Sequence, residues 1–204
     1  MEKNYQVSFE IAGPAAMFTR PDSGAAPISY PAPTYSAAKG MFEAVVRYTS
    51  AHIRPTKVEI CKPIRFHKYV TNYGGPLRKG NQRSKGASYQ IPATILVDVC
   101  YRIYGVIEAV TAAPCGNNHL HALQEIFKRR LKNGQCFYMP CFGWKEFVPS
   151  YLGPLRYGTE IEKSINQILP SMLHSVFDSP MNGKANPVYR QNVEIMEGVL
   201  RYDQ

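Results

Sequence analysis

Hydrophobic and polar residues follow two different periods in the first quarter of the chain. Residues Tyr5 to Ile11 alternate between apolar and polar, which is the period of a half-buried strand. Several prolines and Gly13 then indicate a long loop. From Tyr35 to Tyr48 the apolar residues recur at helical spacing, and Thr34 or Ser36 can cap that helix. The pattern predicts a strand, a loop and an amphipathic helix.

The pattern in the middle of the chain predicts two strands joined by a loop. The stretch Lys57 to Tyr69 favours an extended conformation, with a bend at Pro63, and Ile95 to Val110 is the strongest run of apolar and β-branched residues. Between them, Asn72 to Gln90 has no periodicity and is rich in glycine and cations. We expect a basic loop that joins two strands.

The stretch from Asn117 to Phe147 predicts a second helix that runs into another strand. Its apolar stripe is Leu120, Leu123, Phe127 and Leu131. Asn118 can cap the start, and Gly134 suits the left-handed residue that commonly follows a helix. The aromatic segment from Cys136 to Phe147 is expected to be extended.

The order strand, helix, strand, strand, helix, strand is that of an α+β ferredoxin-like sandwich of the kind found in RNA-recognition domains. We expect this domain to occupy residues 1–149, with residues 72–90 as a basic insertion loop. The weaker pattern after Pro149 includes a short helix at Glu160 to Leu169 and two strands, at Ser171 to Phe177 and Val193 to Tyr202. It predicts a small, sheet-containing C-terminal appendage over residues 150–204.

The charge of the chain points to an anionic partner. Its formal net charge is +9 at pH 7, and its isoelectric point is near 9.3. Nucleic acid and a membrane surface both fit that balance. No apolar run is long enough to span a bilayer, and the first residues lack the apolar core of a signal peptide. We therefore expect a cytoplasmic protein with no membrane partner.

Cysteines and nucleotide-binding motifs indicate no cofactor. The five cysteines include no C-x-x-C pair, so buried free thiols are favoured over a zinc site. The Walker loop, the dinucleotide-binding glycine pattern, H-E-x-x-H and G-x-S-x-G are all absent from the sequence. We expect chemistry without a metal or cofactor.

Clustered cations are the candidate RNA contacts. The glycine-rich loop holds four of them with no acidic residue nearby, and both helices present cations opposite their apolar stripes. A solvated charged face on an ordinary core helix remains the alternative interpretation. The candidates are Lys39, Arg47, Arg78, Lys79, Arg83, Lys85, Lys128, Arg129 and Arg130.

Several stretches resemble, in order, the d subtype of the Cas-five proteins of CRISPR type I-C systems. They are GPAAMFTRP at 13–21, SYPAPTYSAAKGMFEAV at 29–45, KPIRFHKYVTN at 62–72, TILVDVCY at 94–101, FKRRLKNGQCFYMPCFGWKEF at 127–147, and the weaker NGKANPVYRQNVEIMEGVL at 182–200. The resemblance implies a ferredoxin-like protein that cuts CRISPR repeat RNA without metal. It also implies that the protein stays on the 5′ handle of the guide RNA, with the backbone and large subunits of a surveillance complex.

Metal-free cleavage of RNA uses the neighbouring 2′-hydroxyl as nucleophile, so the site needs a base, an acid and a cation. The family is similar in carrying a tyrosine late in the first helix and a Lys-His pair at the start of the second. Here the tyrosine position falls on Val46, with Tyr48 close by. Without a gap the pair falls on Ala122 and Leu123.

With one extra helical turn the pair falls on Asn118 and His119, which keeps the histidine and loses the lysine. His119 and His121 lie in the first turn of the second helix, where amides and the helix dipole favour a phosphate. The catalytic candidates are therefore His119, His121 and Tyr48, with Lys39 or Lys128 as the cation. Three alternatives stay open. The two histidines could be surface residues with no catalytic role, and Tyr48 could belong to the core. The protein could also be a non-catalytic subunit that only binds the 5′ handle.

Overall fold

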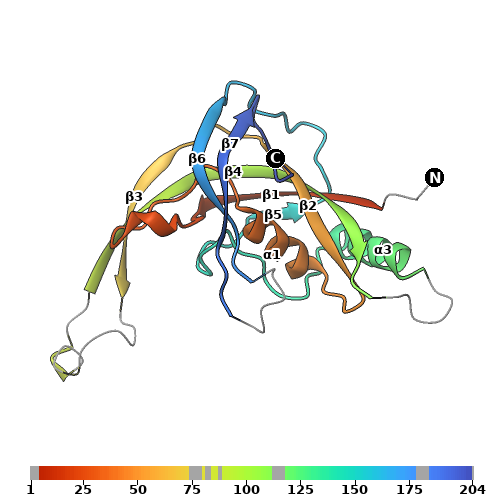
Figure 1. Ribbon diagram of the computed structural model, residues 1–204, viewed down its shortest axis with the longest axis horizontal. Coiled ribbons are helices and arrows are strands. Elements are labelled where there is room, and N and C mark those ends of the chain that lie inside the picture. Colours follow the sequence, from red (N-terminus) through yellow and green to blue (C-terminus); the bar gives the residue numbers. More distant parts are fainter. Residues whose placement is uncertain are drawn as a thin grey trace.

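The computed structural model describes residues 5–73, 80, 84–86, 89–111, 118–177 and 184–203. Elements are labelled as in Figure 1. The described strands and helices are β1 (Gln6–Ala16), the 3₁₀ turn η1 (Pro21–Ser23), α1 (Tyr35–Val45), β2 (Ala51–Ile60), β3 (Phe66–Tyr73), β4 (Tyr89–Ala109), α3 (His119–Lys132), β5 (Tyr151–Gly153), β6 (Gln167–Ser175), β7 (Val188–Met196) and β8 (Val199–Arg201).

The long strand β4 is the centre of the sheet. Within the described residues, eight antiparallel strands form one sheet in the order β5-β1-β4-β2-β8-β7-β6, and β3 also pairs with β4. β1 runs along one edge of β4, from Gln6 opposite Val106 to Ala16 opposite Leu96. β2 and then β3 follow one another along the other edge. The fold class is therefore α+β, as predicted.

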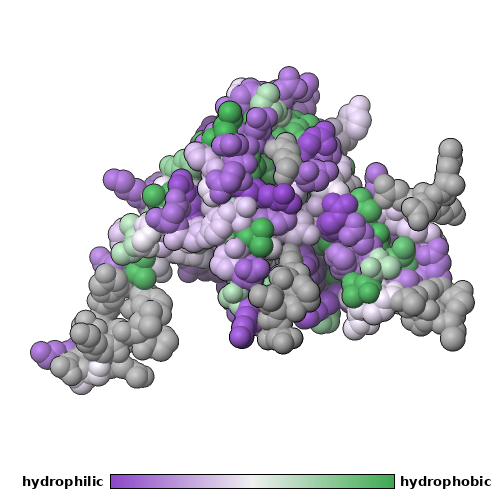
Figure 2. Space-filling model, in the orientation of Figure 1, coloured by the Kyte–Doolittle hydropathy of each residue, from purple (hydrophilic) through white to green (hydrophobic). Residues whose placement is uncertain are grey.

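Helices α1 and α3 lie against the same face of this sheet, beneath its arch (Figure 1). The ring centroid of Phe9 on β1 is 4.9 Å from that of Phe42 on α1 and 6.3 Å from that of Phe127 on α3. Phe42 and Phe127 are 5.7 Å apart. This aromatic junction, Phe9–Phe42–Phe127, is fully buried and joins both helices to the sheet. On the face shown in Figure 2, hydrophobic residues form separate patches among hydrophilic ones.

Three helix-end predictions are confirmed. The side chain of Thr34 accepts a hydrogen bond from Ala37 N, and that of Asn118 accepts one from His121 N. Gly134 has a φ of 64°, the left-handed conformation expected just past α3. Both helices begin where a short polar side chain can satisfy a free amide.

β1 is longer than the sequence predicts, because Gly13 and Pro14 lie inside the strand rather than in a loop. Gly13 pairs with Val99, and a Cβ at its position would lie 2.6 Å from the ring of Phe142. Glycine is needed here because the ring packs directly on the strand backbone. Gly13 therefore marks the close approach of the Phe142 ring and does not end the strand.

The stretch Lys57 to Tyr69 is two strands and not one bent strand. β2 ends at Ile60 and β3 begins at Phe66. Between them the chain stays on the edge of β4, since Cys61 N donates to Cys100 O and Val97 N donates to Arg65 O. β2 also begins earlier, at Ala51, and contains Pro55 beside a register shift that accommodates its missing amide hydrogen.

The predicted strand from Cys136 to Phe147 is wrong. This segment is irregular and folds back on the sheet, where Phe142 O accepts a hydrogen bond from Met17 N. Gly143 has a φ of 84°, and a Cβ there would lie 1.9 Å from Met17 O. Phe142 and Phe147 fill the core from this loop, which the apolar pattern alone cannot distinguish from a strand.

The C-terminal residues extend the same sheet. β5 pairs with β1, and β8 pairs with β2 and β7. The short helix expected at Glu160 to Leu169 is wrong, because residues 160–166 are not helical and β6 begins at Gln167. The expected strands at Ser171 to Phe177 and Val193 to Tyr202 fall on β6 and on β7 with β8. The division at residue 149 stays a prediction.

A buried carboxylate ties the segment after β5 to the outer face of the sheet. Glu10 is 0% exposed and accepts hydrogen bonds from Arg156 N at 3.0 Å, Arg156 Nε at 2.6 Å and the Thr159 hydroxyl at 2.8 Å. Arg102 Nε lies 3.4 Å away. Burial acts to raise the pKa of Glu10, but the backbone amide and guanidinium of Arg156 and the Thr159 hydroxyl outweigh it, so the pKa is lowered.

Phe127→Ala should lower the free energy of unfolding by about 3–5 kcal/mol, because it leaves a cavity in the aromatic junction. Urea denaturation followed by circular dichroism measures this. Phe137→Ala, at an exposed phenylalanine just beyond α3, is the matched control and should stay within about 0.5 kcal/mol. Equal losses in the two variants would show that the junction does not organise the core.

The pH dependence of stability should change in Glu10→Gln. A lowered folded-state pKa stabilises the protein above the ordinary carboxyl pKa, and this stabilisation disappears as pH falls through the folded-state pKa. Wild type should therefore lose more unfolding free energy than Glu10→Gln between about pH 6 and pH 3. Glu125→Gln, at an exposed carboxylate, is the control and should follow wild type. Parallel curves for wild type and Glu10→Gln would contradict the inference.

Candidate nucleic-acid interface and active site

A polar cavity of about 190 Å³ lies where α1 ends and β2 begins. The last turn of α1 and the residues after it supply Glu43, Arg47 and Tyr48, and β2 supplies His52. Leu123, one turn into α3, closes the cavity from the other helix. The remaining lining residues are Phe42, Val46, Ala51 and Ile53. A cation, a phenol, a carboxylate and an imidazole thus line one small space, which is a set of groups suited to proton transfer.

Tyr48 lines this cavity because α1 is shorter than predicted. The helix ends at Val45, and Val46 has extended backbone angles. Tyr48 is 39% exposed. The interpretation of Tyr48 as part of the apolar core stripe is therefore wrong. Val46, at the family's tyrosine position, is buried and donates its backbone N–H to Phe42 O.

His119 is an interior residue. It is 7% exposed and shares the buried face of α3 with Leu123, Phe127 and Leu131. Its Nε2 atom is buried and has no hydrogen-bond partner among the described residues. The stripe predicted from sequence began at Leu120, which is only partly buried. An orphaned ring nitrogen costs stability, so it calls for an explanation in terms of a bound group or water.

His121 is exposed, unlike His119. Its backbone N–H is capped by the Asn118 side chain, which also donates from Nδ2 to the Tyr5 hydroxyl at 2.5 Å. The His121 ring lies 6.1 Å from the Tyr5 ring. These contacts fix the start of α3 and leave the imidazole accessible to a substrate.

The cations of α3 point in different directions. Arg130 donates from Nη1 to Val45 O at 3.0 Å and so caps the end of α1. Lys128 lies 3.2 Å from Glu125 and, with Lys132, lines a separate groove of about 460 Å³ beside β1. Arg129 is exposed. On α1, Lys39 is half-buried, and beyond it Arg47 is exposed at the polar cavity.

Most of the glycine-rich loop lies outside the described residues. Arg78, Lys79 and Arg83 lie outside the described residues, and Lys85 is exposed. The end of β3 and the start of β4, which flank the loop, extend to the opposite end of the molecule from α3 (Figure 1). The strand ends that flank the loop are therefore far from the cations of α3.

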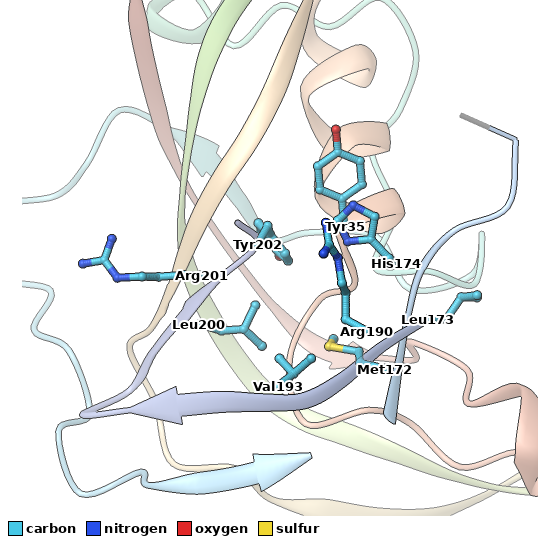
Figure 3. Close-up of a pocket in the computed structure, with 9 residues that line it drawn as sticks. All are labelled: Tyr35, Met172, Leu173, His174, Arg190, Val193, Leu200, Arg201 and Tyr202. Atoms are coloured by element: carbon cyan, nitrogen blue, oxygen red, sulfur yellow. The ribbon is translucent and has the colours of Figure 1, made fainter. Parts of the chain in front are cut away.

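A second cavity, shown in Figure 3, joins α1 to the C-terminal strands. Its volume is only about 20 Å³, which is room for a water molecule and no more. The Tyr35 and His174 rings are stacked with centroids 4.1 Å apart, and Arg201 points away from them (Figure 3). We interpret this cavity as part of the packing between α1 and β6.

Two residues of the polar cavity, Glu43 and His52, were not among the candidates predicted from the sequence. No motif surrounds His52, whose Nε2 lies 3.7 Å from a Glu108 oxygen and whose Nδ1 has no partner in the described part of the chain. Its position beside Tyr48 follows from the turn between α1 and β2. Across the residues that the structure describes, no three His, Cys, Asp or Glu side chains are grouped to hold a metal ion. No described helix is both long and apolar enough to cross a membrane.

The fold is shared with solved structures of low sequence identity. A crystal structure of a CRISPR-associated protein superposes with a TM-score of 0.71 at 18% identity, covering 96% of this chain and 90% of the other. A functionally uncharacterized protein from Streptococcus mutans superposes with a TM-score of 0.70 at 15% identity, covering 96% and 91%. A chain of a CRISPR RNA-guided surveillance complex gives a TM-score of 0.58 at 14% identity, covering 96% and 91%.

The chain belongs to the Cas5d family of CRISPR-associated proteins (Cas_Cas5), whose family model matches residues 7–168. The CRISPR pre-crRNA endoribonuclease Cas5d of Mannheimia succiniciproducens is 30% identical over 191 residues, which is 84% of each chain. The protein of the same name from Thermus thermophilus is 28% identical over 151 residues, covering 73% of this chain and 64% of its own length. The resemblance seen in the sequence is thereby confirmed.

Diethyl pyrocarbonate should distinguish the two histidines of α3. His121 should be modified roughly tenfold faster than His119 in the native protein, because reaction at His119 requires local opening. Tandem mass spectrometry of the peptide that contains both residues measures each rate. In concentrated urea the two rates should converge, which is the control. Equal rates in the native protein would contradict the buried position of His119.

Proposed function

We propose that this chain is an endoribonuclease that cleaves precursor guide RNA within the CRISPR repeat. It cuts without metal, through attack of the 2′-hydroxyl, and remains bound to the 5′ handle. The observation that supports this most is the polar cavity at the end of α1, which places an exposed tyrosine and an arginine near α3 in a member of this family. The names of the Mannheimia and Thermus relatives support the same activity.

We assign the proton transfers to Tyr48 and His121, because both are exposed. One removes the 2′-hydroxyl proton and the other protonates the leaving 5′-oxygen, while Arg47 stabilises the charge that develops on the phosphorane. His119 remains a catalytic candidate after His121. Its unpartnered Nε2 suits a hydrogen bond that forms only when RNA or an ordered water reaches the start of α3.

The cations are proposed RNA contacts in three groups. Arg47 lines the polar cavity and Arg130 bonds to the carbonyl of Val45, while Lys39 lies earlier on α1. Lys128 and Arg129 lie on the exposed side of α3. The third group is Arg78, Lys79, Arg83 and Lys85 of the loop, whose flanking strand ends lie at the opposite end of the molecule from α3 (Figure 1). An RNA that contacts both regions would be extended rather than short.

We propose a ferredoxin-like core for residues 1–149, completed by β5. The strand order β5-β1-β4-β2, with α1 between β1 and β2 and α3 between β4 and β5, supports it. Of residues 150–204, the part that follows β5 would then form the small C-terminal subdomain. We further propose assembly with the backbone and large subunits of a type I-C surveillance complex in the cytoplasm.

A second candidate function is a non-catalytic subunit that only holds the 5′ handle. The buried Val46 at the family's tyrosine position favours it, as does the burial of His119. Val46 has no group that can transfer a proton, and the buried His119 is poorly accessible to a substrate. The two candidates share the RNA-binding surface and differ only in cleavage.

Repeat RNA incubated with the purified protein in excess chelator should be cut at one position. Tyr48→Phe and His121→Ala should each lower the single-turnover rate by about a hundredfold or more without loss of binding, because each removes a proton-transfer group. The controls are Tyr157→Phe and His67→Ala, at an exposed tyrosine and histidine elsewhere, which should retain the rate.

Tight binding without cutting by wild type would leave the non-catalytic subunit as the function. Cutting that requires added Mg²⁺ would contradict the metal-free mechanism. Full activity in both variants would contradict the assignment of Tyr48 and His121.

A further inference from the structure

Three consecutive large side chains are exposed shortly after α3. Phe137, Tyr138 and Met139 are 56%, 45% and 70% exposed. The Phe137 and Tyr138 ring centroids are 5.9 Å apart, with their planes at 68°. We call these three residues the aromatic patch. Adjacent apolar side chains left in water on a soluble protein mark a binding surface more often than a single exposed residue does.

The patch is held against the last turns of α1. The backbone N–H groups of Phe137 and Tyr138 donate to Ala44 O at 2.8 and 3.2 Å, and the Tyr138 hydroxyl donates to Gly40 O at 3.2 Å. These bonds occupy a carbonyl that the helix end would otherwise leave free. The backbone beneath both rings and the hydroxyl of Tyr138 are therefore held before any ligand arrives, which lowers the conformational entropy lost on binding.

The same turn of α1 supplies the polar cavity and two nearby charges. The side chains of Glu43 and Arg47 line the cavity, while the carbonyl of Ala44 between them bonds to the patch. Burial and the charge of Glu43 raise the pKa of Tyr138, and the charge of Arg47 opposes them. Arg130, bonded to Val45 O, adds a cation at this end of the helix.

We propose that the aromatic patch is a stacking platform for an unpaired base of the repeat RNA next to the cut site. Phe137 and Tyr138 offer ring faces to the base, and Arg47 and Arg130 attract the adjoining phosphates. The site rests on the proposed function, because the RNA that enters the polar cavity must pass the turn of α1 to which the patch is bound. Its ligand is single-stranded RNA.

The chemistry of the patch favours RNA over a protein partner. Aromatic rings with neighbouring arginines are the combination that binds unstacked bases and their phosphates. A stable protein interface needs about 20–30 residues on each side, with a continuous apolar centre. Here the three exposed side chains adjoin a polar cavity and cations.

The test uses repeat RNA with 2-aminopurine substituted in turn at each unpaired position beside the hairpin. Phe137→Leu and Tyr138→Leu keep an apolar side chain but lose the ring face. Each should weaken binding roughly tenfold, and each should abolish the fluorescence quenching seen with wild type at one of the positions. Phe66→Leu, at a 50% exposed phenylalanine that begins β3, is the matched control and should behave as wild type.

Urea denaturation checks that all variants fold as stably as the control. Wild type could bind and cut the RNA while the patch variants match Phe66→Leu in affinity and quenching. In that case the proposed stacking of a base on the patch is wrong, and a protein is left as the ligand of the patch. If wild type neither binds nor cuts repeat RNA, the proposed function fails, and this inference fails with it.

Discussion

The contact of Phe9, Phe42 and Phe127 is the constraint on which the rest of the structure depends. Each ring comes from a different element, and the three centroids lie within 4.9–6.3 Å of one another. Once both helices are fixed on the sheet in this way, the end of α1 must lie near the first turns of α3. Leu123, one turn before Phe127, therefore closes the cavity that Arg47 and Tyr48 open toward solvent.

The end of α1 thus contacts both proposed RNA-binding features, the polar cavity and the aromatic patch. Its last carbonyls bond to the aromatic patch and to Arg130, and its last side chains line the polar cavity. In the proposed mechanism the cation and the phenol come from one segment, Arg47 and Tyr48, and the imidazole comes from His121 at the start of α3. Val46 is buried at the tyrosine position that the family resemblance implies, and Tyr48 two residues further on is exposed.

The elements that local pattern determines were predictable from sequence. The caps at Thr34 and Asn118, the left-handed Gly134 and the long apolar strand β4 all depend on neighbouring residues. The class of the fold followed from their order. The family resemblance then supplied the proposed activity, which no pattern of hydrophobic residues contains.

Contacts between distant segments were not predictable. Gly13 is inside a strand because Phe142 packs on it, and the segment around Gly143 is a loop because it bonds to Met17. His119 is buried because it lies one turn before Leu123, although a histidine at a helix start suggests an exposed residue. Similarly, the exposure of Tyr48 depends on the residue at which α1 ends. The cations of α3 lie in different places because Arg130 contacts α1, whereas Lys128 faces the groove beside β1.

Hydrogen exchange with and without a repeat RNA that lacks the 2′-hydroxyl at the cut site tests the central claim most directly. The RNA should slow exchange most at residues 43–52, 118–124 and 136–139, because these segments surround the polar cavity and the aromatic patch. Protection confined to β6 and β7, with none at the end of α1, would contradict the account.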